Sequence, residues 1–315
     1  MGTHELDGIR ALVTGGGGFI GARLVAALQA RGATVTLTRR PGDGRATPGA
    51  RALAADLSRP GEARAAIEDA RPEVVFNLAG YGVKAGEGDE AAARALNADL
   101  PVALAEALLR APPTSWRGLR LVHAGSALEY GLAGGDLREG TLPQPHTSYG
   151  RTKLAGAEAV IAAAGEGLPA VVARLFNVYG PGEQPEKLLP TLLAAADSQR
   201  LIPLTAGAQR RDFVYVDDAV EGLLRLACAP PGPPVVNLAT GALTPVRSFA
   251  LEAAAQLDIP LWRLDFGALP TRGSEMAHDP VAVGALRARL GWLPATTVPQ
   301  GIARTLAAHR EAPRG

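Results

Sequence analysis

The chain has 315 residues, of which 47% are apolar and 20% charged, so it can bury one large core or two that share an interface. Its 32 basic and 31 acidic side chains leave a net charge of +1, which argues against a nucleic-acid-binding surface. A single cysteine, Cys228, excludes an internal disulfide, and without paired Cys or clustered His we expect no metal site. With no secretory signal and no run of roughly 18 apolar residues, we expect a soluble cytoplasmic protein without a membrane span.

Short apolar runs alternate with Ala-rich helical stretches through the first half of the chain. Apolar strands separated by helices predict a parallel sheet covered on both faces, the doubly wound α/β architecture, which places ligands beyond the carboxyl ends of its strands. Pro101 lies inside the third helical stretch and is expected to kink it, because proline has no backbone N–H. The expected strands span 10–15, 34–38, 50–56, 73–80, 119–125 and 169–177, and the expected helices span 19–32, 60–70, 89–109 and 148–164.

The pattern changes after about residue 178, where Pro and Gly become frequent and helices no longer alternate regularly with strands. We therefore predict a first domain formed by 1–177 plus about 213–239. A smaller, partly interleaved α/β lobe is predicted from about 178–212 and 240–315, and we expect this lobe to bind the substrate.

Four consecutive glycines in VTGGGGFIGARL join the first predicted strand to the first predicted helix. Glycines there allow a tight turn and let backbone amides approach a pyrophosphate at the helix N-terminus. The run fits both Gly16-x-Gly18-x-x-Gly21 and Gly15-x-x-Gly18-x-x-Gly21, so spacing alone leaves the motif ambiguous. Because the loop follows an apolar strand and opens a helix, it predicts the dinucleotide site of a Rossmann fold.

The second predicted strand ends in Thr38-Arg39-Arg40, where NAD enzymes carry the Asp or Glu that bonds the adenosine ribose. Guanidinium groups bind a 2′-phosphate that a carboxylate repels, so these arginines favour NADP(H), with NAD as the alternative. The alternative is that they are solvated surface charges in a chain this rich in Arg. Asp43 is interpreted as a turn residue in PGDG, and Asp56, closing the third strand, is expected to face the adenine.

Tyr149 and Lys153 lie four residues apart at the start of an Ala-rich helix, and hence on one face of it. The pKa of a tyrosine is ordinarily near 10, and a nearby ammonium favours the phenolate. A Lys ammonium can also bond the two hydroxyls of a nicotinamide ribose. Ser126, after the fifth strand, is expected to hold the substrate oxygen. Together these side chains predict a general acid/base set.

Six segments in order, TGGGGFIG, FNLAG, GSALEYG, YGRTK, FNVYGPG and RRDFVYVDD, resemble the extended short-chain dehydrogenase/reductase superfamily in its nucleotide-sugar epimerase/dehydratase branch. The resemblance runs from about residue 9 to about 308. It implies a nucleoside-diphosphate sugar substrate, a homodimer paired through the helices around 89–110 and 148–165, and a catalytic triad of Ser126, Tyr149 and Lys153 with Tyr149 as acid/base. With the motifs above, the predicted cofactor site comprises Gly15, Gly18, Phe19, Ile20, Gly21, Arg39, Arg40, Asp56, Leu57, Leu78, Ala79, Gly80, Tyr149 and Lys153.

The same resemblance implies the residues that bind the sugar nucleotide. Asn177 and Arg211 match such positions, Arg211 at the diphosphate. PEKLLP resembles a segment of thymidine-diphosphate-sugar dehydratases, which makes Lys187 and Leu188 candidates for the nucleotide-diphosphate site. Lys84 and Arg272 lie where substrate loops are expected, although a surface role is the alternative for both Lys84 and Lys187. Ser126 completes the predicted substrate-binding set.

Three alternatives for the function follow from this resemblance. Dehydratases carry Thr-Asp-Glu where this chain has Ser126-Ala127-Leu128, which argues against a 4,6-dehydratase, and Glu129 would point to the opposite face of an extended segment. The arginines after the second strand favour an NADPH-dependent 4-ketoreductase of a thymidine-linked 4-keto-6-deoxyhexose over an NAD-dependent 4-epimerase. A non-catalytic dinucleotide-binding protein is the third alternative, but such proteins typically lose the Tyr or the Lys.

Overall fold

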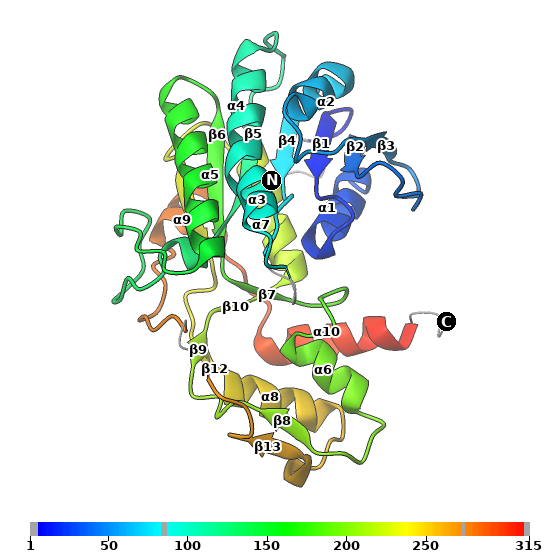
Figure 1. Ribbon diagram of the computed structural model, residues 1–315, viewed down its shortest axis with the longest axis vertical. Helices are drawn as coiled ribbons and strands as arrows, with labels where there is room; N and C mark the ends of the chain where they lie inside the picture. Colours follow the sequence, from blue (N-terminus) through cyan, green and yellow to red (C-terminus); the bar gives the residue numbers. More distant parts are fainter. Residues whose placement is uncertain (1–5, 83–86, 272–274, 312–315) are drawn as a thin grey trace.

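The computed structural model describes residues 6–82, 87–271 and 275–311. A parallel sheet at its centre is formed by β1 (Arg10–Thr14), β2 (Thr34–Arg39), β3 (Arg51–Ala54), β4 (Val74–Asn77), β5 (Leu121–Ser126), β6 (Ala170–Leu175) and β11 (Val235–Leu238). Its strand order is β11-β6-β5-β4-β1-β2-β3 (Figure 1). This contains the 3-2-1-4-5-6 order of the Rossmann fold, so the predicted doubly wound architecture is confirmed.

Helices cover both faces of the sheet. The alternation of strand side chains separates two cores: Val13 of β1 enters one of them and Leu12 the other. Because the strands are buried on both faces of the sheet, their sequences are almost continuously apolar. One face is covered by α1 (Phe19–Gln29) and α7 (Val216–Cys228), and the other by α2 (Glu62–Ala70), α4 (Leu100–Arg110) and α5 (Ser148–Gly165).

The helical stretch predicted for 89–109 is divided into three parts. They are α3 (Glu90–Arg94), the π-helical turn η1 (Ala95–Asp99) and α4, in which Pro101 is the second residue. A proline near a helix start costs little, because that N–H would have no partner within the helix. A Cβ on Gly156 of α5 would clash with the carbonyl oxygen of Asn97 in this turn. The small residue at 156 therefore lets α5, which carries Tyr149 and Lys153, pack closely against the π-helical turn before Pro101.

A second lobe lies below the sheet in Figure 1. β10 pairs with β7 in a small separate sheet, whereas β11 belongs to the large sheet. The segment 213–239, expected to return to the first sheet, therefore does so only after β10. The residue boundaries of the two lobes stay a prediction. The strands pair as β7 (Asn177–Tyr179) with β10 (Phe213–Tyr215), β8 (Ile202–Leu204) with β13 (Leu264–Phe266), and β9 (Arg210–Arg211) with β12 (Thr244–Pro245). Its helices are α6 (Leu188–Ala195), α8 (Val246–Gln256) and α10 (Val298–Glu311), while α9 (Gly284–Leu290) packs near β11.

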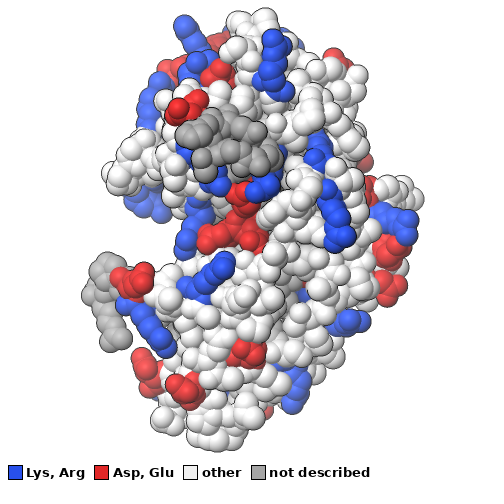
Figure 2. All heavy atoms as spheres, turned by 180° about the vertical axis from the view of Figure 1, so that it is seen from behind, with Lys and Arg blue, Asp and Glu red and all other residues white. Residues whose placement is uncertain are grey.

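The surface carries charges of both signs. On the face shown in Figure 2, basic and acidic side chains are interspersed, and the molecule is hollowed on one side between the two lobes. Within the described ranges, no helix is long and apolar enough to cross a membrane.

Candidate active site

The glycine loop after β1 lies directly against the end of β4. Gly15 has a left-handed φ of +69°, and a Cβ there would lie 2.7 Å from the backbone of Leu78 and Ala79. A Cβ on Gly21 would clash with the carbonyl oxygen of Gly15. α1 starts after Gly18 with no side-chain cap and no acidic residue in its first turn, so its first amides are available to an anion. The loop therefore has the shape and the polarity that a pyrophosphate requires.

Arginine side chains border this loop at the end of β2. The Arg39 guanidinium lies 3.3 Å from where a Cβ of Gly17 would be. It donates to Asp43 at 3.2 Å and to Thr47 at 2.6 Å, while its Nε is buried without a hydrogen-bond partner. Asp43, interpreted from sequence as a turn residue, also accepts two hydrogen bonds from the Arg45 side chain, at 2.8 and 2.7 Å. An unpaired guanidinium N–H beside a glycine loop suits a phosphate group.

Sequence reasoning missed Arg45 in this cluster. Its only sequence signal was its position shortly after Arg39 and Arg40. Arg40 is exposed, as Arg45 is, and its positive charge helps to lower the pKa of Asp56.

Asp56, predicted to face the adenine, comes two residues after β3 ends at Ala54. Its carboxylate accepts hydrogen bonds from the Ser58 amide at 3.2 Å and the Ser58 hydroxyl at 2.6 Å, which lowers its pKa. It also pairs with Arg59 at 3.0 Å. Leu57 is partly buried against the core beneath α2. Asp56 thus already has partners within its own turn.

A buried polar network supports the loop between β4 and α3. The Asn97 amide bonds both the N–H and the C=O of Tyr81, at 2.9 and 2.8 Å, and the Thr152 hydroxyl of α5 at 3.0 Å. Gly80, the last residue of the FNLAG segment predicted to bind the cofactor, lies next to this network. A Cβ on Gly80 would lie 3.2 Å from the Asn97 side-chain oxygen. Asn97 is fully buried and ties η1, the loop and α5 together.

Ser126, Tyr149 and Lys153 meet at the carboxyl end of β5. Ser126 is the last residue of the strand rather than part of the following loop, and its side chain lies near that of Tyr149, whose pKa it lowers. The Lys153 ammonium is buried and donates to the Ala124 carbonyl at 2.6 Å. α5 begins here because the Thr147 hydroxyl accepts from the Gly150 amide at 3.0 Å. The structure therefore brings the predicted catalytic set together.

Burial is the largest influence on the pKa values of Tyr149 and Lys153. It raises the pKa of Tyr149 to about 12, with Ser126 opposing and the negative charges of Glu129 and Glu87 adding to it. Burial also lowers the pKa of Lys153 to about 8, against the opposite effect of Glu129. From the sequence we expected a nearby ammonium to favour the phenolate, whereas desolvation of the phenol is the largest effect on its pKa. At neutral pH Tyr149 is a protonated phenol, which can donate its proton.

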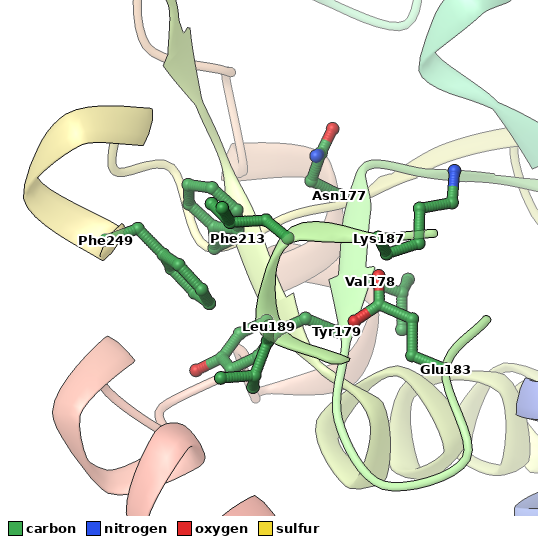
Figure 3. Close-up of a pocket in the computed structure, with 9 residues that line it drawn as sticks. Asn177, Val178, Tyr179, Glu183, Lys187, Leu189, Phe213 and Phe249 are labelled. Carbon is green, nitrogen blue, oxygen red and sulfur yellow. The ribbon is translucent and has the colours of Figure 1, made fainter. Parts of the chain in front are cut away.

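Three predicted substrate residues line one cavity of about 80 Å³ in the second lobe. Asn177 and Lys187 point to the same side of it (Figure 3), and Leu188 opens α6, whose N-terminus has no side-chain cap. A lysine beside free helix amides is a favourable arrangement for an anion. The remaining lining residues are Val178, Tyr179, Glu183, Leu189, Phe213 and Phe249.

Glu183 is a residue of this cavity that sequence reasoning did not single out. Its Oε2 is buried without a hydrogen-bond partner, and burial raises its pKa to about 7, although Lys187 lowers it. Opposite it, the Phe213 ring stacks on Phe249 with centroids 4.3 Å apart. Nothing in the sequence separated Glu183 from the exposed Glu186 three residues later, because only the fold decides which of them is buried.

Arg211 lies on β9, outside the lining of that cavity, and pairs with Glu275. Lys84 and Arg272, the other two predicted substrate residues, lie outside the described residues. In the described parts of the chain, no group of three or more His, Cys, Asp or Glu side chains is placed to hold a metal ion.

A Rossmann sheet with a glycine cradle and a Ser-Tyr-Lys set at its carboxyl edge defines an NAD(P)-dependent enzyme of the short-chain dehydrogenase/reductase superfamily. A sequence model of the NAD dependent epimerase/dehydratase family matches residues 11–239, and the chain belongs to that family. The resemblance seen in the sequence motifs is confirmed.

Individual relatives match almost the whole chain. The dTDP-6-deoxy-L-talose 4-dehydrogenase (NAD(P)(+)) of Kitasatospora kifunensis is 35% identical over 96% of both chains. The dTDP-L-rhamnose 4-epimerase of Burkholderia thailandensis is 26% identical over 94% of both. The solved structure of MoeE5 in complex with UDP-glucuronic acid and NAD is 29% identical, has a TM-score of 0.81, and covers 95% of this chain and 98% of its own.

Proposed function

We propose that the protein is an NADPH-dependent reductase that converts the C4 ketone of a thymidine-diphosphate 4-keto-6-deoxyhexose into an alcohol. The observation that carries the proposal is the placement of the partly exposed Tyr149 phenol next to Ser126 at the carboxyl end of β5. The similarity to a dTDP-6-deoxy-L-talose 4-dehydrogenase supports it, because oxidation of a C4 alcohol is the reverse of this reduction. That relative's name also covers both NAD and NADP.

The residues present fit a dinucleotide. The amides after Gly15 and Gly18 would hold the pyrophosphate, Arg39 and Arg45 the 2′-phosphate, and Lys153 the nicotinamide ribose. When bound, the cofactor supplies the hydride. The bare N-terminus of α1 and the unpaired Nε of Arg39 are the two features that favour this assignment.

The proton in this reaction comes from the protein. Ser126 would hold the ketone oxygen by a hydrogen bond, and Tyr149 would donate its proton to that oxygen while the carbonyl carbon gains the hydride. The charge of Lys153 stabilises the phenolate that remains, and Tyr149 then regains a proton from solvent. In the second lobe, Asn177 and Lys187 would bind the nucleotide diphosphate.

One observation favours a second function, NAD-dependent 4-epimerisation. Asp43 lies between Arg39 and Arg45, and a carboxylate at this position could accept hydrogen bonds from the adenosine ribose of NAD. The similarity to a dTDP-L-rhamnose 4-epimerase agrees with this alternative. To distinguish the two, freshly purified protein is denatured and the released dinucleotide identified. Stoichiometric NAD would favour the epimerase, whereas NADP(H), or an empty site that prefers NADPH, would favour the reductase.

The acid/base assignment is tested by Tyr149→Phe. With a dTDP-4-keto-6-deoxyhexose and NADPH, we expect turnover to fall at least roughly 100-fold, in the usual range for loss of a general acid. NADPH binding is the internal control and should stay within a few-fold of wild type, because the ring that packs against Gly82 is retained. Turnover within a few-fold of wild type would mean that another group donates the proton.

We also propose a homodimer formed through α4 and α5, as the family resemblance implies. Val102 and Leu109 leave large apolar side chains exposed on α4. Light scattering coupled to size-exclusion chromatography should give twice the 32.4 kDa chain mass, and Val102→Glu should shift the protein toward the monomer.

A further inference from the structure

Glu129 is a buried carboxylate that the mechanism above does not use. The sequence argument placed it on the opposite face of an extended segment, but residues Ala127–Glu129 form a 3-10 turn that folds its side chain inward. It is fully buried. One carboxylate oxygen accepts from the Ser126 amide at 2.7 Å, and the other accepts from Arg174 Nε at 2.7 Å. Glu129 therefore touches the backbone of a predicted catalytic residue directly.

The pair formed by Glu129 and Arg174 is part of a longer buried network. Arg174 lies on β6, is 2% exposed, and stacks on the Tyr130 ring with 4.4 Å between its Cζ and the ring centroid. The Tyr130 hydroxyl donates to the Arg138 carbonyl at 2.8 Å and lies 2.7 Å from the Asn237 side-chain oxygen of β11. The network thus joins the end of β5 to β6 and β11, which keeps the carboxylate in one position.

The charged and titratable groups that face Glu129 come from two elements. Arg174 faces it from β6, and Lys153 and Tyr149 face it from α5. Lys153 donates to the Ala124 carbonyl, and a Cβ on the next residue, Gly125, would lie 2.7 Å from a carboxylate oxygen of Glu129. Its negative charge raises the pKa of Lys153, against the burial that lowers it, and raises the pKa of Tyr149. Burial raises the pKa of Glu129 itself, but the two cations and the Ser126 amide oppose this.

Two further groups act on the set without touching Glu129. His123 of β5 is fully buried, and the charge of Lys153 adds to the burial that lowers its pKa. Glu87, whose carboxylate accepts from the Gly82 amide at 2.7 Å, raises the pKa of Tyr149. Of all these groups, Glu129 is the one whose charge supports the protonated state of Lys153.

We propose that Glu129 is a positioning residue that holds Ser126 in place through its backbone and keeps the buried Lys153 as an ammonium ion. This inference rests on the proposed function, in which Lys153 binds the cofactor ribose. A Lys in an apolar environment tends to lose its proton, and a fixed carboxylate reverses that tendency. Arg174 has the separate task of neutralising the carboxylate, since a buried unpaired charge would destabilise the fold.

The test compares a single and a double substitution. Glu129→Gln removes the negative charge but sets an amide NH₂ against the Arg174 donor. The double variant Glu129→Gln/Arg174→Gln removes both charges and restores the hydrogen bonds. The new amide oxygen at position 174 can accept from the NH₂ at position 129, whose own oxygen still accepts from the Ser126 amide. Glu166→Gln, which removes an exposed carboxylate near the far end of α5, is the matched control.

The measurement is the affinity for NADPH, or for NADH if wild type binds it more tightly, from cofactor fluorescence between pH 6 and 10. The difference in affinity between wild type and Lys153→Met is the contribution of the ammonium. We expect this contribution to disappear as the pH rises through the Lys153 pKa of about 8. In both Glu129 variants the midpoint should move down by about one pH unit, the typical effect of losing one opposite charge. In Glu166→Gln the midpoint should stay.

The outcomes separate this inference from the proposed function. If wild type binds neither dinucleotide at any pH, the proposed function fails. If wild type binds and the folded double variant titrates with the wild-type midpoint, only the role of Glu129 is overturned. A double variant that does not fold despite its paired hydrogen bonds overturns it as well, because the carboxylate would then serve folding rather than the charge of Lys153.

Discussion

The free energy that folding costs at the partly buried Glu183 carboxylate depends on pH. Its pKa rises from 4.5 to about 7 on folding, and each unit corresponds to about 1.36 kcal/mol, so the full shift amounts to about 3 kcal/mol. Because the residue is partly exposed, screening reduces this, and we expect about 2 kcal/mol. A carboxyl group with a raised pKa stabilises the fold below its unfolded pKa, and this contribution is lost as the pH rises through the folded one. Wild type should therefore lose stability between pH 5 and 8 relative to Glu183→Gln, whose amide does not titrate.

Urea unfolding of both proteins at pH 5 and at pH 8 measures this effect. The free energies of unfolding should be similar at pH 5, and Glu183→Gln should be about 2 kcal/mol more stable at pH 8. Glu186→Gln, an exposed substitution in the same segment, controls for the general loss of a negative charge and should show no such pH dependence. If the difference between wild type and Glu183→Gln is equal at the two pH values, the argument from burial is refuted.

Three further predictions concern the cofactor site and the second lobe. Gly21→Ala should weaken dinucleotide binding at least roughly ten-fold, because its Cβ would clash with Gly15, and an unchanged fluorescence titration would contradict the predicted cradle. Arg45→Ala should lower the NADPH-to-NADH affinity ratio about ten-fold by removing a phosphate partner, and an unaltered ratio would assign Arg45 to the surface. Arg263→Met should lower the free energy of unfolding by about 3 kcal/mol, because Arg263 is 1% exposed and donates to three carbonyls of 195–200. A loss below roughly 1 kcal/mol, measured by urea unfolding, would contradict this.

Local patterns predicted the large features of the fold. Apolar strand runs, Ala-rich helices and the glycine run after β1 depend on periodicity and on backbone freedom, which neighbours in the chain determine. The sequence did not predict the π-helical turn before Pro101, where the Asn97 carbonyl lies close to Gly156 of α5. The placement of β10 with β7 also depended on a long-range pairing.

The sequence by itself determined the Rossmann architecture and predicted Ser126, Tyr149 and Lys153 as the catalytic set, because these follow from local periodicity and from short motifs with fixed spacing. Only the tertiary structure decided the charge states and the partners. Glu129 and Arg174 are 45 residues apart in sequence, yet they form a buried ion pair next to the predicted catalytic set. Burial, which no local pattern reveals, raises the pKa of Tyr149 and lowers that of Lys153. The physical reason is that desolvation and long-range Coulomb interactions depend on three-dimensional packing, whereas secondary structure and turn chemistry depend mainly on adjacent residues.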